Sequence, residues 1–425
     1  MPFALQAILW GVVTLSVVVF LHEGGHFLAA RAFGVRVHEF MLGLPGPKLS
    51  FKRGDTRYGV TMIPFGGYTK IAGMDGDIHN PHLKAVLTAV TSADCALTAA
   101  DVAQLCDISE DEAALVLGTL VDWFALTYDE KDTTWRSVFA PELADNPDAL
   151  FSRAQERTYL ALPFWKRAVV LLNGIIINII FALIVFTVVL SVWGPVVYNG
   201  KVDPVAKGPA AVAGMKAGDV ITKVNATSVS SFTDITQALK NLHPGDTVTL
   251  SYRRPSGGEA GAARAGQAKV LLGHNPQDSS VGYLGIEAVP EHEPLPVPRA
   301  AGQSFTYVKL TVQGILGFFT PGKFRQSVNN SASIVGISVI AAQVARTSAL
   351  DYAQLVAAIS LSLGLMNLLP IPPLDGGKVL IEAFEAIRRK PLSLKVNAAL
   401  SAAGLGLLVV FMIYVMSHDI LRLFK

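Results

Sequence analysis

The chain has 425 residues, of which 51% are apolar and only 16% are charged, and its mean hydropathy is +0.43. This composition excludes an ordinary soluble protein and requires membrane segments. The net charge of +2 indicates no class of partner.

Windows of roughly 20 apolar residues, long enough to cross about 30 Å of hydrocarbon, occur near 3–21, 168–193, 353–371 and 397–416. We therefore predict a polytopic α-helical membrane protein with about four transmembrane helices. Two further apolar stretches, 305–320 and 331–346, are interrupted by polar residues and are predicted to be interfacial or re-entrant helices.

Lysine and arginine residues gather in the connection between the first and second spans and in the connection between the third and fourth. By the positive-inside rule both connections are cytoplasmic, which places the N-terminus and residues 194–352 outside. The first apolar run could instead be a signal peptide. An uncleaved span is favoured because no Lys or Arg precedes the run and a charged motif ends it.

That motif is Leu21-His22-Glu23-Gly24-Gly25-His26, at the inner end of the first span. Residues four apart share one helix face, so His22 and His26 can direct two imidazoles at one Zn²⁺ with Glu23 beside them. This arrangement is typical of enzymes that use a metal to make water attack a peptide bond. We expect Glu23 to be the general base.

The third span runs in the same direction as the first, so its inner end is expected at the same depth. There the chain reads Asn367-Leu-Leu-Pro-Ile-Pro-Pro-Leu-Asp375-Gly-Gly. Asp375 is the predicted third ligand, which leaves a fourth position open, as in catalytic zinc sites. A lone histidine or aspartate at a helix end is more often a satisfied interfacial residue, but ionisable residues in membrane segments are costly and mark function. Asn367 is predicted either to hydrogen-bond substrate or to make a polar packing contact.

These motifs resemble the site-2 protease family of intramembrane zinc metalloproteases, and specifically its bacterial branch, the regulator of sigma-E protease type. Pro64-Phe65-Gly66-Gly67-Tyr68 is similar to the family's membrane-associated β-hairpin, and Asn178-Ile-Ile-Phe-Ala is similar to its second span. The resemblance covers most of the chain outside residues 80–150. One departure is that Gly174-Ile175 and Ser333-Ile334 stand where family members often carry Gly-Pro.

The resemblance implies cleavage of single-pass membrane proteins, such as pre-trimmed anti-sigma factors, within or beside the transmembrane helix. It implies that His22, His26 and Asp375 bind zinc, that Glu23 is catalytic, and that Asn367 contacts substrate. A hairpin edge strand could hold the substrate extended, with Gly66 and Gly67 allowing close backbone approach. Alternatively, these glycines simply form turns.

Residues 208–221 are similar to the start of a bacterial PDZ domain. A helical stretch at 233–242, strands at 247–253 and 268–272, a Gly/Ala-rich hairpin at 256–267 and the closing segment 282–286 fit the remainder. We expect one such domain, acting as a size filter for trimmed substrates. The alternative is a specific peptide receptor.

Residues 83–137 resemble a winged helix: capped helices at 97–106 and 113–123, then short strands at 125–128 and 134–136 around a charged turn. From Lys84 to Leu150 there are 13 acidic and three basic residues. Phosphate contacts need a basic surface, so we predict a protein-interaction module that contacts a cytoplasmic partner, with no nucleic acid bound.

The sequence thus predicts a multi-pass zinc metalloendopeptidase of the bacterial inner membrane, in contact with membrane lipid. The rival interpretations are a zinc-binding membrane scaffold that has lost catalysis and a metal transporter. The intact Glu23 argues against the scaffold. The near absence of ionisable residues at 168–193 and 397–416 argues against the transporter. The expected segments are 1–30 (first span), 31–80 (hairpin region), 81–150 (acidic insertion), 151–194 (linker and second span), 195–292 (PDZ), 293–352 (linker and interfacial helices), 353–378 (third span with the third ligand) and 379–425 (cytoplasmic connection and fourth span).

Overall fold

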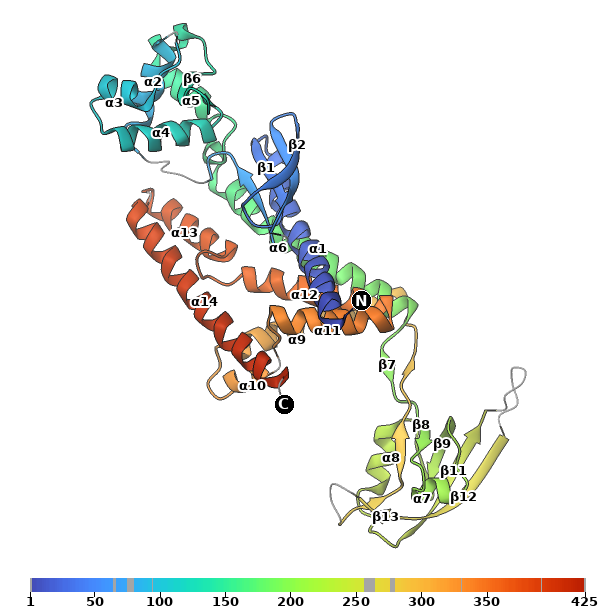
Figure 1. Cartoon of the computed structure of the whole chain (residues 1–425). Helices are drawn as coiled ribbons and strands as arrows, with labels where there is room; N and C mark the ends of the chain where they lie inside the picture. Colours follow the sequence, from blue (N-terminus) through green and yellow to red (C-terminus); the bar gives the residue numbers. More distant parts are fainter. Residues whose placement is uncertain are drawn as a thin grey trace. The chain divides into compact units, whose positions relative to one another are not determined.

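The computed structural model describes residues 2–63, 66–74, 80–93, 95–255, 264–275, 280–329, 331–390 and 392–423 (Figure 1). They fall into two compact units. The first combines Met1–Thr187 with Ala301–Lys425, and the second is Val188–Ala300.

Four helices in the described part of the chain are long and apolar enough to cross a membrane. They are α1 (Phe3–Ala32), α6 (Phe164–Val192), α12 (Ala349–Asn367) and α14 (Leu394–Leu423). The predicted number of spans is therefore confirmed. Helix α1 continues past the end of its predicted apolar window, α6 begins before its window, and α14 exceeds its window at both ends. Helix α12 begins four residues before its predicted window and ends at Asn367, four residues before the predicted end.

Three further helices lie between the second and third spans in sequence: α9 (Val297–Gly317), α10 (Phe324–Asn329) and α11 (Ile334–Thr347). None of them is among the four candidate spans. With 14 residues, α11 is about 21 Å long and too short to cross. It packs tightly along α1, since a Cβ on Gly11 would collide with the side chain of Ser338. Helix α9, with 21 residues, is long enough to cross but is not among the candidate spans, so only the length of α11 bears on the prediction of interfacial or re-entrant helices.

After α1 the chain forms a sheet of β1 (Val37–Leu42), β2 (Lys48–Arg53), β3 (Thr56–Thr61) and β4 (Gly67–Ile71) in the order β2-β3-β1-β4. The predicted β-hairpin is only one part of this four-stranded sheet. The β2–β3 hairpin exists, but β1 pairs with β3 in parallel and with β4 antiparallel. Pro64 and Phe65 of the predicted hairpin motif lie outside the described residues.

The next segment is a small helical body with its own core, which we call the insertion module (residues 83–155). Its elements are α2 (Leu83–Ser92), α3 (Ala99–Cys106), α4 (Glu110–Asp122), β5 (Leu126–Asp129), β6 (Thr134–Ser137), the 3₁₀ helix η1 (Pro141–Asp145) and α5 (Pro147–Gln155). The predicted caps are present: Thr98 and Asp101 form a capping box on α3, and Ser109 caps α4. Leu150 and Ala154 of α5 are buried in this core, so the module ends later than the predicted boundary at residue 150.

The second unit contains a sheet in the order β12-β11-β9-β8-β15, with β10 paired to β9. Its strands are β8 (Lys201–Pro204), β9 (Asp219–Val224), β10 (Thr227–Ser228), β11 (Thr247–Arg254), β12 (Arg264–Leu271) and β15 (Ile286–Ala288). Helices α7 (Pro209–Val212) and α8 (Phe232–Leu239) complete the unit around one apolar core. Most of the predicted Gly/Ala-rich hairpin, residues 256–263, lies outside the described residues.

Candidate metal centre and active site

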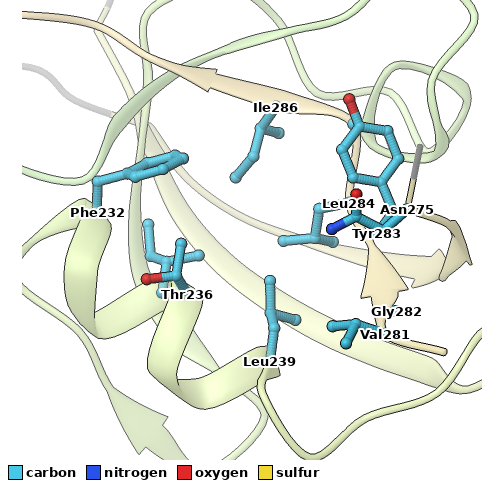
Figure 2. A pocket seen from close by; sticks show the side chains of 11 residues that line it. Phe232, Thr236, Leu239, Asn275, Val281, Gly282, Tyr283, Leu284 and Ile286 are labelled. Atoms are coloured by element: carbon cyan, nitrogen blue, oxygen red, sulfur yellow. The ribbon is translucent and has the colours of Figure 1, made fainter. Parts of the chain in front are cut away.

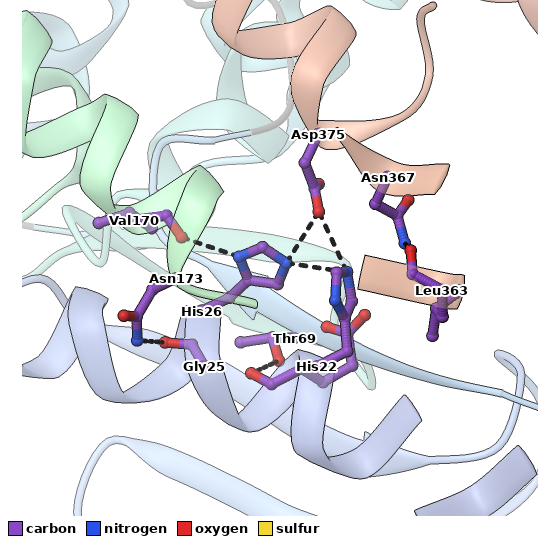
Figure 3. A network of polar contacts seen from close by, with 10 residues as sticks. His22, Gly25, His26, Thr69, Val170, Asn173, Leu363, Asn367 and Asp375 are labelled. Atoms are coloured by element: carbon purple, nitrogen blue, oxygen red, sulfur yellow. Dashed lines mark hydrogen bonds and ion pairs between the residues drawn. The ribbon is translucent and has the colours of Figure 1, made fainter. Parts of the chain in front are cut away.

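The two histidines and the aspartate predicted as ligands converge on one point. His22 Nε2 lies 3.0 Å and His26 Nε2 lies 3.3 Å from Asp375 Oδ2, and the two histidine nitrogens are 3.3 Å apart (Figure 3). All three residues are buried. Two segments separated by about 350 residues of sequence therefore meet in one small polar cluster within an apolar bundle.

The cluster fits a tetrahedral metal ion. Zinc binds histidine nitrogen and carboxylate oxygen at about 2.0–2.2 Å, so two ligand atoms at tetrahedral corners are about 3.3 Å apart. The three observed separations, 3.0, 3.3 and 3.3 Å, are close to that value. Apart from these two histidine nitrogens, the buried Asp375 Oδ2 has no hydrogen-bond partner among the described residues. A cation at this point would satisfy it.

Asp375 lies on a helix separate from the third span, which differs from the prediction of one span over 353–378. Helix α12 ends at Asn367, and α13 (Asp375–Arg388) begins at the aspartate itself. Three prolines in the connection, Pro370, Pro372 and Pro373, cannot continue the first helix. The connection turns the chain so that the first residue of α13 points at the histidines.

Helix α6 orients His26 through its backbone. The carbonyl oxygen of Val170 lies 2.8 Å from His26 Nδ1. A carbonyl can only accept, so Nδ1 carries the proton and the lone pair of Nε2 faces the cluster. Sequence reasoning missed Val170 because a backbone carbonyl contact leaves no mark in a residue's identity.

Two glycines allow α1 and α6 to cross at this depth. A Cβ on Gly25 would lie 2.5 Å from the carbonyl oxygen of Asn173, and a Cβ on Gly174 would lie 2.6 Å from His26 Nε2. The Asn173 side-chain amide donates to the Gly25 carbonyl at 2.7 Å and joins the two helices (Figure 3). Gly174, noted above only as a departure from Gly-Pro, is therefore part of the cradle around the histidines.

Glu23 follows His22 on α1 and is half-buried beside the cluster. Strand β4 lies against it: Thr69 Oγ1 donates to the Glu23 carbonyl at 3.1 Å, and a Cβ on Gly67 would lie 3.6 Å from Glu23 Cγ. A side chain at position 67 would therefore contact Glu23, and its Cβ would lie 2.9 Å from the Met41 carbonyl oxygen. Gly66 is a turn residue, with φ of +92° and its carbonyl accepting from the Gly43 amide at 2.9 Å.

Asn367 is the last residue of α12, and its side-chain nitrogen donates to the Leu363 carbonyl one turn back at 3.1 Å (Figure 3). This bond is the kind of polar packing contact that the sequence left open as an alternative. The amide also has a second N–H and an oxygen that this bond does not use.

The second unit has a separate pocket of about 200 Å³ beside α8. Phe232, Thr236 and Leu239 of α8 form one wall, and the segment Val281–Ile286 forms the other (Figure 2). The lining is mostly apolar, which suits a hydrophobic side chain of a peptide.

The insertion module contacts the sheet that lies beside Glu23. Asp122, the last residue of α4, accepts from the Gly73 amide at 2.7 Å, and its carbonyl lies 2.7 Å from His38 Nε2. The His38 ring stacks on Phe124 at 4.0 Å between centroids. Asp122, which is buried, therefore joins the module to the sheet through its carboxylate and its backbone carbonyl, at the edge where β1 begins and β4 ends.

Comparisons with known proteins identify the family of this chain. The model of peptidase family M50 matches residues 10–411. The chain is 31% identical to the zinc metalloprotease RasP of Shouchella clausii (strain KSM-K16), over 96% of this chain and 97% of that protein. It is 28% identical to the regulator of sigma-W protease RasP of Bacillus subtilis (strain 168), over 97% and 98% of the two chains. The resemblance to the site-2 protease family is confirmed: this chain belongs to peptidase family M50 and is a membrane zinc metalloprotease.

Proposed function

We propose that the enzyme hydrolyses a peptide bond within or beside the transmembrane helix of single-pass membrane proteins, in regulated intramembrane proteolysis. The observation that carries this proposal is the convergence of His22, His26 and Asp375 at the end of a membrane helix, with Glu23 beside them. The positive residues flanking α1 favour an active site on the cytoplasmic side of a bacterial inner membrane.

In this proposal His22, His26 and Asp375 hold the zinc. Bound zinc supplies a Lewis acid that polarises the peptide carbonyl and activates water. The Val170 carbonyl keeps His26 in the tautomer whose Nε2 can bind metal. The buried surroundings of all three side chains keep their number and geometry fixed.

Glu23 is the proposed general base. It is adjacent to His22, and successive residues are about 100° apart around a helix, so its carboxylate lies beside the three ligand atoms without joining them. A carboxylate there can take a proton from the attacking water and return it to the leaving amine.

Strand β4 is the proposed substrate-handling element. It is an edge of the four-stranded sheet and lies along α1 next to Glu23. A helical substrate hides its amides in its own hydrogen bonds, so pairing with an edge strand would hold it extended for attack. Gly67 leaves room for the substrate backbone beside Glu23, Gly66 turns the chain into β4, and the Asn367 amide hydrogen-bonds the substrate.

The proposed substrates are pre-trimmed anti-sigma factors or proteins like them. The support for this class is the name of the Bacillus subtilis relative, a regulator of sigma-W protease. A water-filled path to the buried cluster is required for hydrolysis in any of these substrates.

We further propose that residues 195–292 form a PDZ domain that acts as a size filter. The helix α8, the neighbouring segment at 281–286 and the apolar pocket between them support this assignment. Filling the pocket with Thr236→Trp separates the two roles. A filter should still reject untrimmed substrate, whereas a peptide receptor would lose its preference.

The insertion module is proposed to be a winged-helix-like unit that binds a cytoplasmic protein partner or the substrate's cytoplasmic tail. Three helices followed by the β5–β6 hairpin support the fold, and the excess of ten negative charges between Lys84 and Leu150 argues against nucleic acid. Deleting residues 83–150 should change cleavage, substrate choice or partner association. Unchanged behaviour in all three would refute this role.

The proposed activity is tested by Glu23→Gln in purified full-length protein, assayed against membrane-anchored anti-sigma factors and other single-pass proteins. The variant should retain zinc and lose cleavage. Processing equal to that of the parent would contradict the assignment of Glu23.

A further inference from the structure

Asp375, the third candidate ligand, lies on helix α13, which is not a continuation of any of the four candidate membrane spans. Asp375 is the first residue of α13, and α13 is separated from α12 by seven residues that include three prolines. A side chain at the start of a separate helix keeps its position only if the rest of that helix is fixed. The question is what fixes α13 against the helices that carry His22 and His26.

Glu382 lies on the same face of α13 as Asp375, because seven residues make almost two helical turns. Its side chain is largely buried, with 14% exposed. Tyr159 Oη donates to Glu382 Oε1 at 2.6 Å, and Arg167 Nε lies 3.7 Å from Glu382 Oε2. Glu382 therefore meets a hydroxyl donor from the chain before α6 and a guanidinium from the first turn of α6.

The same part of α6 also holds His26. Arg167 precedes Val170 by one turn, and the Val170 carbonyl is the partner of His26 Nδ1. Tyr159 is buried with Val170 and Leu171 in one apolar cluster, and Val379 of α13 packs against that cluster. One short stretch of α6 thus contacts both the helix with the histidines and the helix with the aspartate.

Tyr159 is well suited to be a fixed donor. Burial, together with the neighbouring Glu382 carboxylate, raises the pKa of the Tyr159 hydroxyl far above its ordinary value, so it stays protonated. Its backbone is fixed as well, since the Tyr159 amide donates to the Ala72 carbonyl at 2.8 Å, just past β4. Tyr159 is therefore hydrogen-bonded to the segment that follows the sheet and also packs against α6.

We propose that Tyr159, Arg167 and Glu382 form a latch that sets the position of α13 and so brings Asp375 to the two histidines. They are positioning residues for the metal centre and touch neither metal nor substrate. This inference rests on the proposed role of Asp375 as a zinc ligand.

The test measures zinc affinity of the full-length protein in detergent, by competition with a chelator of known affinity. Loss of a residue that orients metal ligands typically weakens metal binding by about 10–100-fold. We expect a loss of this size for Glu382→Leu and a smaller one for Tyr159→Phe. Glu382→Gln, which keeps an acceptor for the Tyr159 hydroxyl, should recover part of the affinity. Glu385→Gln is the matched control: it is the same substitution one turn further along α13 and should leave zinc affinity at the parental value.

Two further readouts separate positioning from a general loss of structure. Cobalt substituted for zinc should show altered visible absorption bands in Glu382→Leu and unaltered bands in Glu385→Gln. If the latch acts as one unit, Tyr159→Phe should cost little more in a Glu382→Leu background. Tyr159→Phe removes a single oxygen and leaves the packing in place, so it decides the question if Glu382→Leu does not fold.

The outcomes distinguish the latch from the ligand assignment on which it rests. If His22→Ala and Asp375→Asn bind zinc as tightly as the parent, the ligand assignment is wrong. If those variants lose zinc while Glu382→Leu and Tyr159→Phe bind it with parental affinity and parental cobalt spectra, the latch is wrong and the ligand assignment stands.

Discussion

Gly174→Ala should weaken zinc binding although residue 174 is not a ligand. The added Cβ would lie 2.6 Å from His26 Nε2 and 2.8 Å from the His22 carbonyl oxygen. An ordinary contact begins near 3.4 Å, so His26 or helix α6 must shift by roughly 0.8 Å, whereas zinc sites tolerate only about 0.2 Å in ligand distance. Overpacking of this kind costs about 1–3 kcal/mol, which corresponds to about a 5- to 150-fold loss of zinc affinity.

Gly24→Ala is the matched control, because a Cβ there has no atom within 4 Å. Both substitutions place alanine in a membrane helix, where it is a better helix former than glycine by about 1 kcal/mol. Helix propensity alone therefore predicts no loss in either variant. Chelator competition on the two purified proteins gives the comparison. Parental zinc affinity in Gly174→Ala would refute the close packing of α6 against His26.

Two more substitutions test polar contacts outside the four candidate membrane spans, one made by Asp122 and one made by Arg254. Asp122→Ala removes the acceptor of the Gly73 amide and should destabilise the contact between the insertion module and the sheet by about 1–3 kcal/mol. The loss should appear as faster hydrogen exchange of the Gly73 amide. An unchanged exchange rate would show that this hydrogen bond does not stabilise the contact. In the second unit, burial alone would raise the pKa of Asp219, but two hydrogen bonds from Arg254, each 2.7 Å, hold it below its ordinary value. That pair should therefore stabilise the unit fully above about pH 4 and progressively less as pH falls below the unfolded-state pKa of about 3.9. Exchange protection of β9 should follow this course in the parent and should be low at every pH in Arg254→Met; identical profiles would show that the pair contributes nothing.

The convergence of His22, His26 and Asp375 could be predicted from sequence because their spacing carries physical meaning. Residues 22 and 26 share a helix face. The first and third spans cross the membrane in the same direction, so their inner ends, and with them residue 375, are expected at the same depth. Both inferences need only helical geometry and the cost of placing charge in a membrane. The capped helices of the insertion module were predictable for a similar reason, since Thr98 and Ser109 are local signals that act within four residues.

Other features depend on contacts between distant segments and left no local signal. The parallel pairing of β1 with β3 joins strands that are each consistent with a simple hairpin. Tyr159 and Glu382 are 223 residues apart, and neither belongs to a motif. Gly174 matters because of the side chain it lacks, which becomes apparent only once α1 crosses α6. The separate helix of Asp375 was missed because the apolar window of the third span runs into the prolines.

We propose that Glu23 catalyses hydrolysis at a zinc held by His22, His26 and Asp375. The most direct measurement determines zinc content and cleavage of a single-pass membrane substrate together, for the parent, Glu23→Gln and His22→Ala. We predict that Glu23→Gln binds zinc like the parent and cleaves nothing, and that His22→Ala loses both zinc and cleavage. Cleavage by zinc-loaded Glu23→Gln at the parental rate would show that Glu23 is not the general base, and full zinc content in His22→Ala would show that His22 is not a ligand.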